Sequence, residues 1–87
     1  MNVTREMVAD QLKEYLRGAC TLDQVVSWAE EVMAEGEIAE RDFALVRDTV
    51  ARLGVSDVAA FGLTWEEIRE MLETLGYRAR VEFEAAG

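Results

Sequence analysis

Apolar residues recur three and four positions apart along most of the chain, which is the spacing of one face of an α-helix. The pattern predicts four helices: Thr4–Arg17, one from Thr21 that ends at Gly36, Ala39–Leu53, and one from Thr64 that ends at Gly76. The chain contains no proline, and a glycine follows each segment: Gly18, Gly36, Gly54 and Gly76. We expect these glycines to end the helices, because glycine takes the left-handed conformation without steric cost.

Each predicted helix has a face that we expect to lie in the core. For the first two helices these residues are Met7, Val8, Leu12, Tyr15, Leu16 and Ala19, and then Val25, Trp28, Ala29, Val32 and Met33. For the last two they are Phe43, Val46, Val50 and Leu53, and then Ile68, Met71, Leu72 and Leu75. Packed against one another, such faces form a bundle.

Capping signals support these boundaries. Thr21 with Gln24, and Thr64 with Glu67, have the spacing of capping boxes, in which two backbone donors are satisfied reciprocally. At the third helix, Gly54 followed by Val55 predicts a Schellman ending.

After Gly76 the period changes from that of a helix to that of a strand. Tyr77, Ala79, Val81 and Phe83 alternate with charged residues, which predicts a half-buried β-strand over 77–84. A lone strand leaves backbone groups unpaired, so it needs a partner. The segments around Met1–Val3 or Gly36–Ala39, a second copy of the chain, or an extended tail on the bundle are the alternatives.

The fold prediction is therefore an all-α domain spanning residues 1–87, a small antiparallel four-helix bundle. Ser56–Phe61 adds a short helical turn, and residues 77–84 form either a C-terminal strand or an extended tail on the bundle. A chain of 87 residues has room for one domain with a thin core.

The net charge of −9, from 18 acidic and 9 basic side chains, narrows the class of partner. A negative surface repels nucleic-acid phosphates and anionic membranes, and it attracts basic proteins. Solubility alone is the alternative explanation of the charge.

The single cysteine permits no internal disulfide, and no apolar stretch reaches the length of a membrane span. We expect a cytoplasmic protein.

The residues of common active sites are missing from the sequence. The chain has no histidine and no glycine-rich phosphate loop, and Cys20 is its only cysteine. Cys20 precedes a predicted helix, where it fits a hydrophobic staple on Val25 better than a nucleophile. We expect no catalytic residue, no cofactor and no metal site, and therefore not an enzyme.

Rows of carboxylates on the helices are the best candidate binding surfaces. Glu6, Asp10 and Glu14 follow one another at four-residue steps, and Glu66, Glu70 and Glu73 share a face of the fourth helix. Like charges at this spacing slightly destabilise a helix, so either solvation or a basic partner accounts for them. Trp65 beside these acids is an interface anchor or a core residue.

Residues 12–29, Leu12-Lys-Glu-Tyr-Leu-Arg-Gly-Ala-Cys-Thr-Leu-Asp-Gln-Val-Val-Ser-Trp-Ala29, resemble the opening helical hairpin of small bacterial immunity proteins. The likeness consists of an aromatic-Leu-x-Gly turn, a threonine cap and a Trp-Ala pair. It implies an acidic helical bundle that neutralises a basic nuclease toxin, and it transfers no functional residue. The sequence thus favours a protein-binding module for a basic partner; the alternative is a homodimeric module that pairs through its C-terminal strand.

Overall fold

The computed structural model describes residues 2–57 and 62–78 of the chain. The elements are β1 (Asn2–Val3), α1 (Arg5–Leu16), α2 (Leu22–Glu35), β2 (Glu37–Ile38), the 3-10 turn η1 (Glu40–Asp42), α3 (Phe43–Leu53) and α4 (Trp65–Thr74). The prediction of a mostly helical fold is confirmed, and a small two-stranded sheet accompanies the helices.

The helix starts follow the capping signals. Thr21 Oγ1 accepts a hydrogen bond from the Gln24 amide at 3.2 Å, and the Thr21 amide donates to Gln24 Oε1 at 2.8 Å, so this capping box is complete. Thr64 Oγ1 accepts from the Glu67 amide at 3.2 Å. The predicted return bond from Glu67 is replaced by an ion pair with Arg52, which has the stronger attraction for a carboxylate.

The helix ends differ from the prediction at two of the four glycines. Gly18 and Gly76 have positive φ angles of 77° and 98°, as expected. Gly54 has φ −63° and Gly36 has φ −77°, and both are conformations open to any L-residue. The prediction of a Schellman ending at Gly54 is therefore wrong: the backbone stays near-helical there, and Val55 is 43% exposed.

The small sheet joins two segments that flank the first two helices. β1 and β2 pair in parallel, with Asn2 opposite Glu37 and Val3 opposite Ile38. The Ala39 amide extends the pairing by donating to the Val3 carbonyl at 2.9 Å. Val3 is fully buried, so the sheet closes one end of the core. Both segments were expected as alternative partners for the C-terminal strand, whereas they pair with each other.

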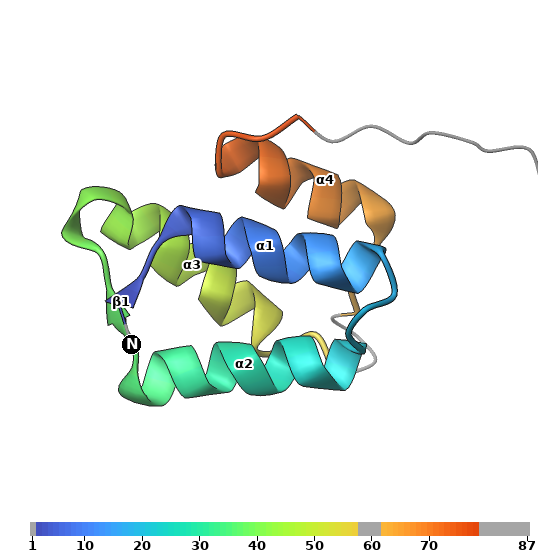
Figure 1. Cartoon of the computed structure of the whole chain (residues 1–87), viewed down its shortest axis with the longest axis horizontal. Coiled ribbons are helices and arrows are strands. Elements are labelled where there is room, and N and C mark those ends of the chain that lie inside the picture. The colour runs from blue at the N-terminus through green and yellow to red at the C-terminus, as the bar shows by residue number, and fades with distance from the viewer. Residues whose placement is uncertain (1, 58–61, 79–87) are drawn as a thin grey trace, which may run out of the picture.

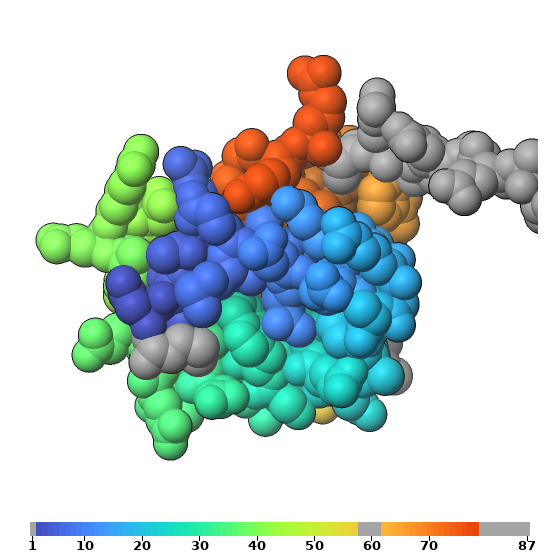
Figure 2. All heavy atoms as spheres, viewed as in Figure 1, coloured from blue at the N-terminus to red at the C-terminus, as the bar shows by residue number. Residues whose placement is uncertain are grey.

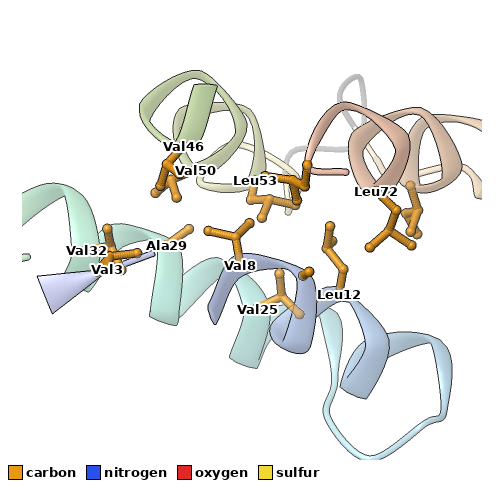
Figure 3. Packing of buried hydrophobic residues seen from close by; sticks show 13 residues of the cluster. Val3, Val8, Leu12, Val25, Ala29, Val32, Val46, Val50, Leu53 and Leu72 are labelled. Atoms are coloured by element: carbon orange, nitrogen blue, oxygen red, sulfur yellow. The ribbon is translucent and has the colours of Figure 1, made fainter. Parts of the chain in front are cut away.

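The helices pack around α1, which contacts α2, α3 and α4. Figure 1 shows α1 and α2 running side by side in opposite directions, α3 crossing them, and α4 on the side of α1 away from α2. Figure 3 shows Val8 and Leu12 pointing from α1 into the space between the other helices. The core is aliphatic, and every member is at most 3% exposed: Val3, Val8, Ala9, Leu12, Val25, Ala29, Val32, Val46, Val50, Leu53, Ile68, Leu72 and Leu75.

Several residues that we expected in the core lie at the surface. Leu16 is 42% exposed and Met33 is 52% exposed, because each lies at the margin of its helix's buried stripe. Phe43 is 47% exposed. The third helix was expected from Ala39, but a 3-10 turn occupies Glu40–Asp42 and α3 begins at Phe43. Phe43 is therefore the first residue of α3, and the centroid of its ring lies 5.6 Å from the Arg47 guanidinium group.

An arginine joins the C-terminal end of α3 to the start of α4. Arg52 Nη2 lies 2.6 Å from Glu67 Oε2, and its Nη1 donates to Ser56 Oγ at 3.1 Å. The Ser56 hydroxyl donates back to the Arg52 carbonyl at 3.2 Å, and Arg52 Nη2 also reaches the Gly62 carbonyl at 3.4 Å. Charge-assisted bonds of this kind fix orientation, so this group sets how α4 follows α3.

Two predictions fall largely outside the described residues. The predicted turn at Ser56–Phe61 has only its first two residues in the described part of the chain. The predicted strand over 77–84 has only Tyr77 and Arg78 there, and neither is in a strand. Tyr77 packs against the core, with Lys13 Nζ 4.3 Å from its ring centroid.

Leu12→Ala should lower the free energy of unfolding by about 2–5 kcal/mol, because it removes a fully buried side chain from the centre of the core. Urea unfolding followed by far-UV circular dichroism measures the change. Leu16→Ala is the matched control on the same helix, and it should cost less than about 1 kcal/mol. Equal losses of unfolding free energy in the two variants would contradict the burial of Leu12 and the exposure of Leu16.

Gly54→Ala should raise the free energy of unfolding by about 0.5–1 kcal/mol, since φ suits alanine and a Cβ meets only ordinary contacts, the nearest at 3.6 Å. Gly18→Ala should lower it by about 1 kcal/mol because of the positive φ. A Cβ at Gly18 meets nothing within 4 Å, so this cost comes from the backbone alone. Thermal unfolding of the two variants should therefore shift in opposite directions.

Candidate functional site

The predicted acidic row on α1 is exposed and compensated. Each of its three acids has a base within 4.0 Å: the N–O distances are 3.9 Å for Glu6–Arg5, 4.0 Å for Asp10–Lys13 and 3.5 Å for Glu14–Arg17. Exposed pairs of this kind add at most about 1 kcal/mol each. The three bases nevertheless equal the three acids in number, so the side chains of residues 1–17 carry no net charge.

The predicted group on α4 is only partly compensated. Glu73 pairs with Arg69 at 3.2 Å. Glu66 and Glu70 are exposed and make no ion pair with any described residue. Trp65 is the first residue of α4 and is 38% exposed, so part of its ring is available to a partner.

A third acidic surface, on α2, was missed by the sequence reasoning. Residues 1–17 contain three acids and three bases, and so do residues 41–57. Residues 18–40 contain six acids and no base, so they supply −6 of the net charge of −9. The signal is visible in the sequence as the absence of lysine and arginine between Arg17 and Arg41. Unlike Glu6, Asp10 and Glu14, the acids of residues 18–40 form no row of three at three- or four-residue steps.

The structure exposes all six of these acids, and none makes an ion pair within the described parts of the chain: Asp23, Glu30, Glu31, Glu35, Glu37 and Glu40. Figure 2 shows the side chains of α2, coloured cyan to green, along the edge of the molecule opposite α4. Met33, 52% exposed, lies among the acids near the end of the helix. We call Glu30, Glu31, Met33, Ala34, Glu35 and Glu37 the α2 surface.

The charges of the α2 surface conflict with the helix that carries them. The C-terminal end of a helix carries a partial negative charge and favours bases. The last turn of α2 contains no base, and Glu35 is its final residue. Glu31 and Glu35 are also four positions apart, where like charges repel. In the folded chain these acids at the end of α2 remain without bases, whereas the acids of α1 are paired with bases.

The acidic surfaces of α2 and α4 do not form one patch. Figure 1 places the two helices on opposite sides of α1. A single small partner domain in contact with the α2 surface would therefore face away from Trp65 and Glu70.

A shallow hollow of about 620 Å³ lies where the start of α3 meets the end of α4. Arg5, Asp42, Phe43 and Thr74 are among the residues that line it. Arg5 Nε lies 3.4 Å from Asp42 Oδ2, so the two charges satisfy each other inside the hollow. The hollow could not be predicted from the sequence, because its residues come from four separate elements: α1, η1, α3 and α4.

Cys20 has the surroundings of a packing residue. It is half-buried against the core, and its Sγ accepts a hydrogen bond from Gln11 Nε2 at 3.6 Å. Within residues 2–57 and 62–78, no three acidic or cysteine side chains gather closely enough to hold a metal ion. The same residues include no helix long and apolar enough to cross a membrane.

Comparisons with protein families, with curated proteins and with solved structures found no match to this chain.

Replacing both Glu31 and Glu35 by glutamine should raise the free energy of unfolding by about 0.5 kcal/mol at low salt, because it relieves repulsion at the end of α2. The gain should fade in molar salt, where charges are screened within about 3 Å. Glu14→Gln, which removes a paired acid, should not stabilise the protein. Chemical unfolding at two salt concentrations tests this; no gain at low salt would show that the α2 charges are compensated in solution.

Proposed function

We propose that this chain is a non-enzymatic protein-binding module that captures a basic partner protein. The observation that carries the proposal is the uncompensated charge of residues 18–40, which contain six exposed acids and no base, and whose acids make no ion pair with any described residue. Folding has paired acids on α1, α3 and α4 with bases, so the charge left on α2 is available to an incoming partner.

The mechanism we infer is electrostatic steering followed by local contact. A surface of one sign raises the encounter rate with an oppositely charged partner by about ten-fold to a thousand-fold, and salt suppresses the effect. Met33, exposed among the acids of the α2 surface, can add short-range contact there; on the separate surface of α4, Trp65 can do the same.

An immunity-type inhibitor is the particular role that we propose. The support is the small acidic helical fold, the uncompensated α2 surface and the resemblance of residues 12–29 to the opening hairpin of such proteins. In this role the carboxylates cover a basic surface of the toxin. Glu6, Asp10 and Glu14 are the weaker candidates for this contact, since each has a base beside it; Glu66, Glu70 and Trp65 form a second candidate surface.

Self-association is the alternative. β1 and β2 pair with each other along one edge each, so each keeps one edge that a further strand from a second copy could meet. The strand that this role requires, residues 77–84, lies almost wholly outside the described residues.

Affinity capture from host lysate at low and high salt tests the proposal. We expect the native chain to hold a basic protein at low salt and release it at high salt. A triple variant with Glu30→Gln, Glu31→Gln and Glu35→Gln should fail to capture the basic protein, or should associate with it at least about ten-fold more slowly. The matched control, Glu6→Gln, Asp10→Asn and Glu14→Gln, changes the net charge equally and should retain it.

Three outcomes would count against the proposal. Equal losses in the two triple variants would mean that net charge alone, and not the α2 surface, attracts the partner. Capture that does not depend on salt would remove the electrostatic mechanism. Recovery of only further copies of the chain would favour the homodimeric alternative.

A further inference from the structure

The chain reverses its direction after α4 through a fixed turn. Gly76 has a positive φ of 98°, its amide donates to the Glu73 carbonyl at 3.0 Å, and the Tyr77 amide donates to the Leu72 carbonyl at 2.8 Å. These two bonds are those of a Schellman motif, which sets the path of the chain that follows. The described part of the chain ends at Arg78, directly after this turn.

Tyr77 lies on the boundary between α1 and α4. It packs against the core, and Lys13 Nζ is 4.3 Å from the centroid of its ring. Arg5 Nη1 is 3.4 Å from the place that a Cβ on Gly76 would take. Arg5 and Lys13 therefore mark the side of α1 that faces the turn. Since Lys13 is eight residues beyond Arg5, the chain passes along α1 from its start toward its end.

Two exposed apolar side chains lie further along the same boundary. Figure 1 shows the start of α4 beside the end of α1. Leu16 is exposed and follows Lys13 by three positions, so it lies on the same side of α1. Trp65 is exposed and lies about 200° around α4 from Glu67, which pairs with Arg52 of α3, so Trp65 lies on the side of α4 away from α3. We call Lys13, Leu16, Trp65 and Tyr77 the α1–α4 seam.

The residues that follow Tyr77 in the sequence have the period and the length to continue along the seam. In an extended chain, Ala79 and Val81 share the face of Tyr77, because side chains alternate. Val81 is four residues, or about 13 Å, beyond Tyr77. Trp65 is seven residues, or about 10 Å, back along α4 from Leu72, to which Tyr77 is bonded. Ala79 and Val81 therefore come level with Trp65.

The charges of this segment complement those of α4. Arg78 and Arg80 alternate with the apolar residues, so in an extended chain they lie on its other face. Glu66 and Glu70 are exposed and make no ion pair with any described residue. Long arginine side chains can reach sideways to such acids while their stems cover apolar surface. Exposed pairs are weak, so they orient the segment and the apolar contacts hold it.

We propose that residues 79–83 dock in extended form on the α1–α4 seam of the same chain, with Ala79 and Val81 on Leu16 and Trp65. The proposal goes beyond the proposed function and does not rest on it, because the seam and the α2 surface lie on different sides of the molecule. A partner that uses Trp65 as an anchor has to displace this segment, whereas the α2 surface stays free.

NMR on the full chain, labelled with carbon-13 and nitrogen-15, tests the docking. We expect nuclear Overhauser contacts between the methyl groups of Val81 and the indole ring of Trp65. Val81→Ser should shift the indole N–H resonance of Trp65 and leave that of Trp28, half-buried on α2, in place. Glu82→Ser, the matched change on the charged face of the segment, should leave both indole resonances in place.

Three results would overturn the proposal. The first is the absence of contacts between residues 79–83 and the seam in the unmodified chain. The second is an equal shift of the Trp65 resonance in the two variants. The third comes from a mixture of labelled and unlabelled chains: contacts that arise between molecules would place the segment on a second copy and favour the homodimeric alternative. Neither variant alters an acid of α2, so capture of a basic protein by the α2 surface succeeds or fails independently.

Discussion

The burial of α1 among the other three helices is the interaction on which the rest of the structure depends. α1 contacts α2, α3 and α4, and its side chains Val8, Ala9 and Leu12 are fully buried. Burying a leucine or valine side chain contributes about 1.5–3 kcal/mol, and a chain of this size has few such residues. The core is consequently narrow and aliphatic. Phe43 and Trp65 lie at its margins with a third or more of their surface exposed, and Trp28, Tyr15 and Tyr77 are half-buried.

A narrow core covers only one side of each helix, so the outer sides stay exposed. The distribution of acids and bases on these outer sides then decides which surface carries a net charge. On α1 the outer acids alternate with Lys13 and Arg17, which lie three positions from Asp10 and Glu14. On α3, Arg52 is used to hold Glu67 and thereby to position α4. No base occurs on α2 or within four residues of its ends, so α2 keeps its acids uncompensated. Its outer side is therefore the most negative helical surface in the described part of the chain.

Much of the fold could be predicted from the sequence, because its determinants are local. Thr4, Thr21 and Thr64 cap the three helices that begin within one residue of the predicted position. The start of α3 could not be predicted in this way, because Ala39 donates to Val3 across the sheet and the chain makes a 3-10 turn before α3 begins. The pairing of β1 with β2 depends on two segments more than thirty residues apart, and two-residue strands carry no periodicity to detect.

The candidate site shows the same division between local and distant information. The acids of α1 and α4 form clear rows, yet whether a row is available depends on bases three or four positions away and on neighbouring helices. For α2 the sequence alone shows that the acids have no base three or four positions away, since no base occurs between Arg17 and Arg41. The folded chain tolerates the resulting repulsion because the capping box at Thr21 and the buried faces of Val25, Ala29 and Val32 hold α2 in place. A helix anchored at its start and along its inner side can therefore keep an unfavourable charge at its end.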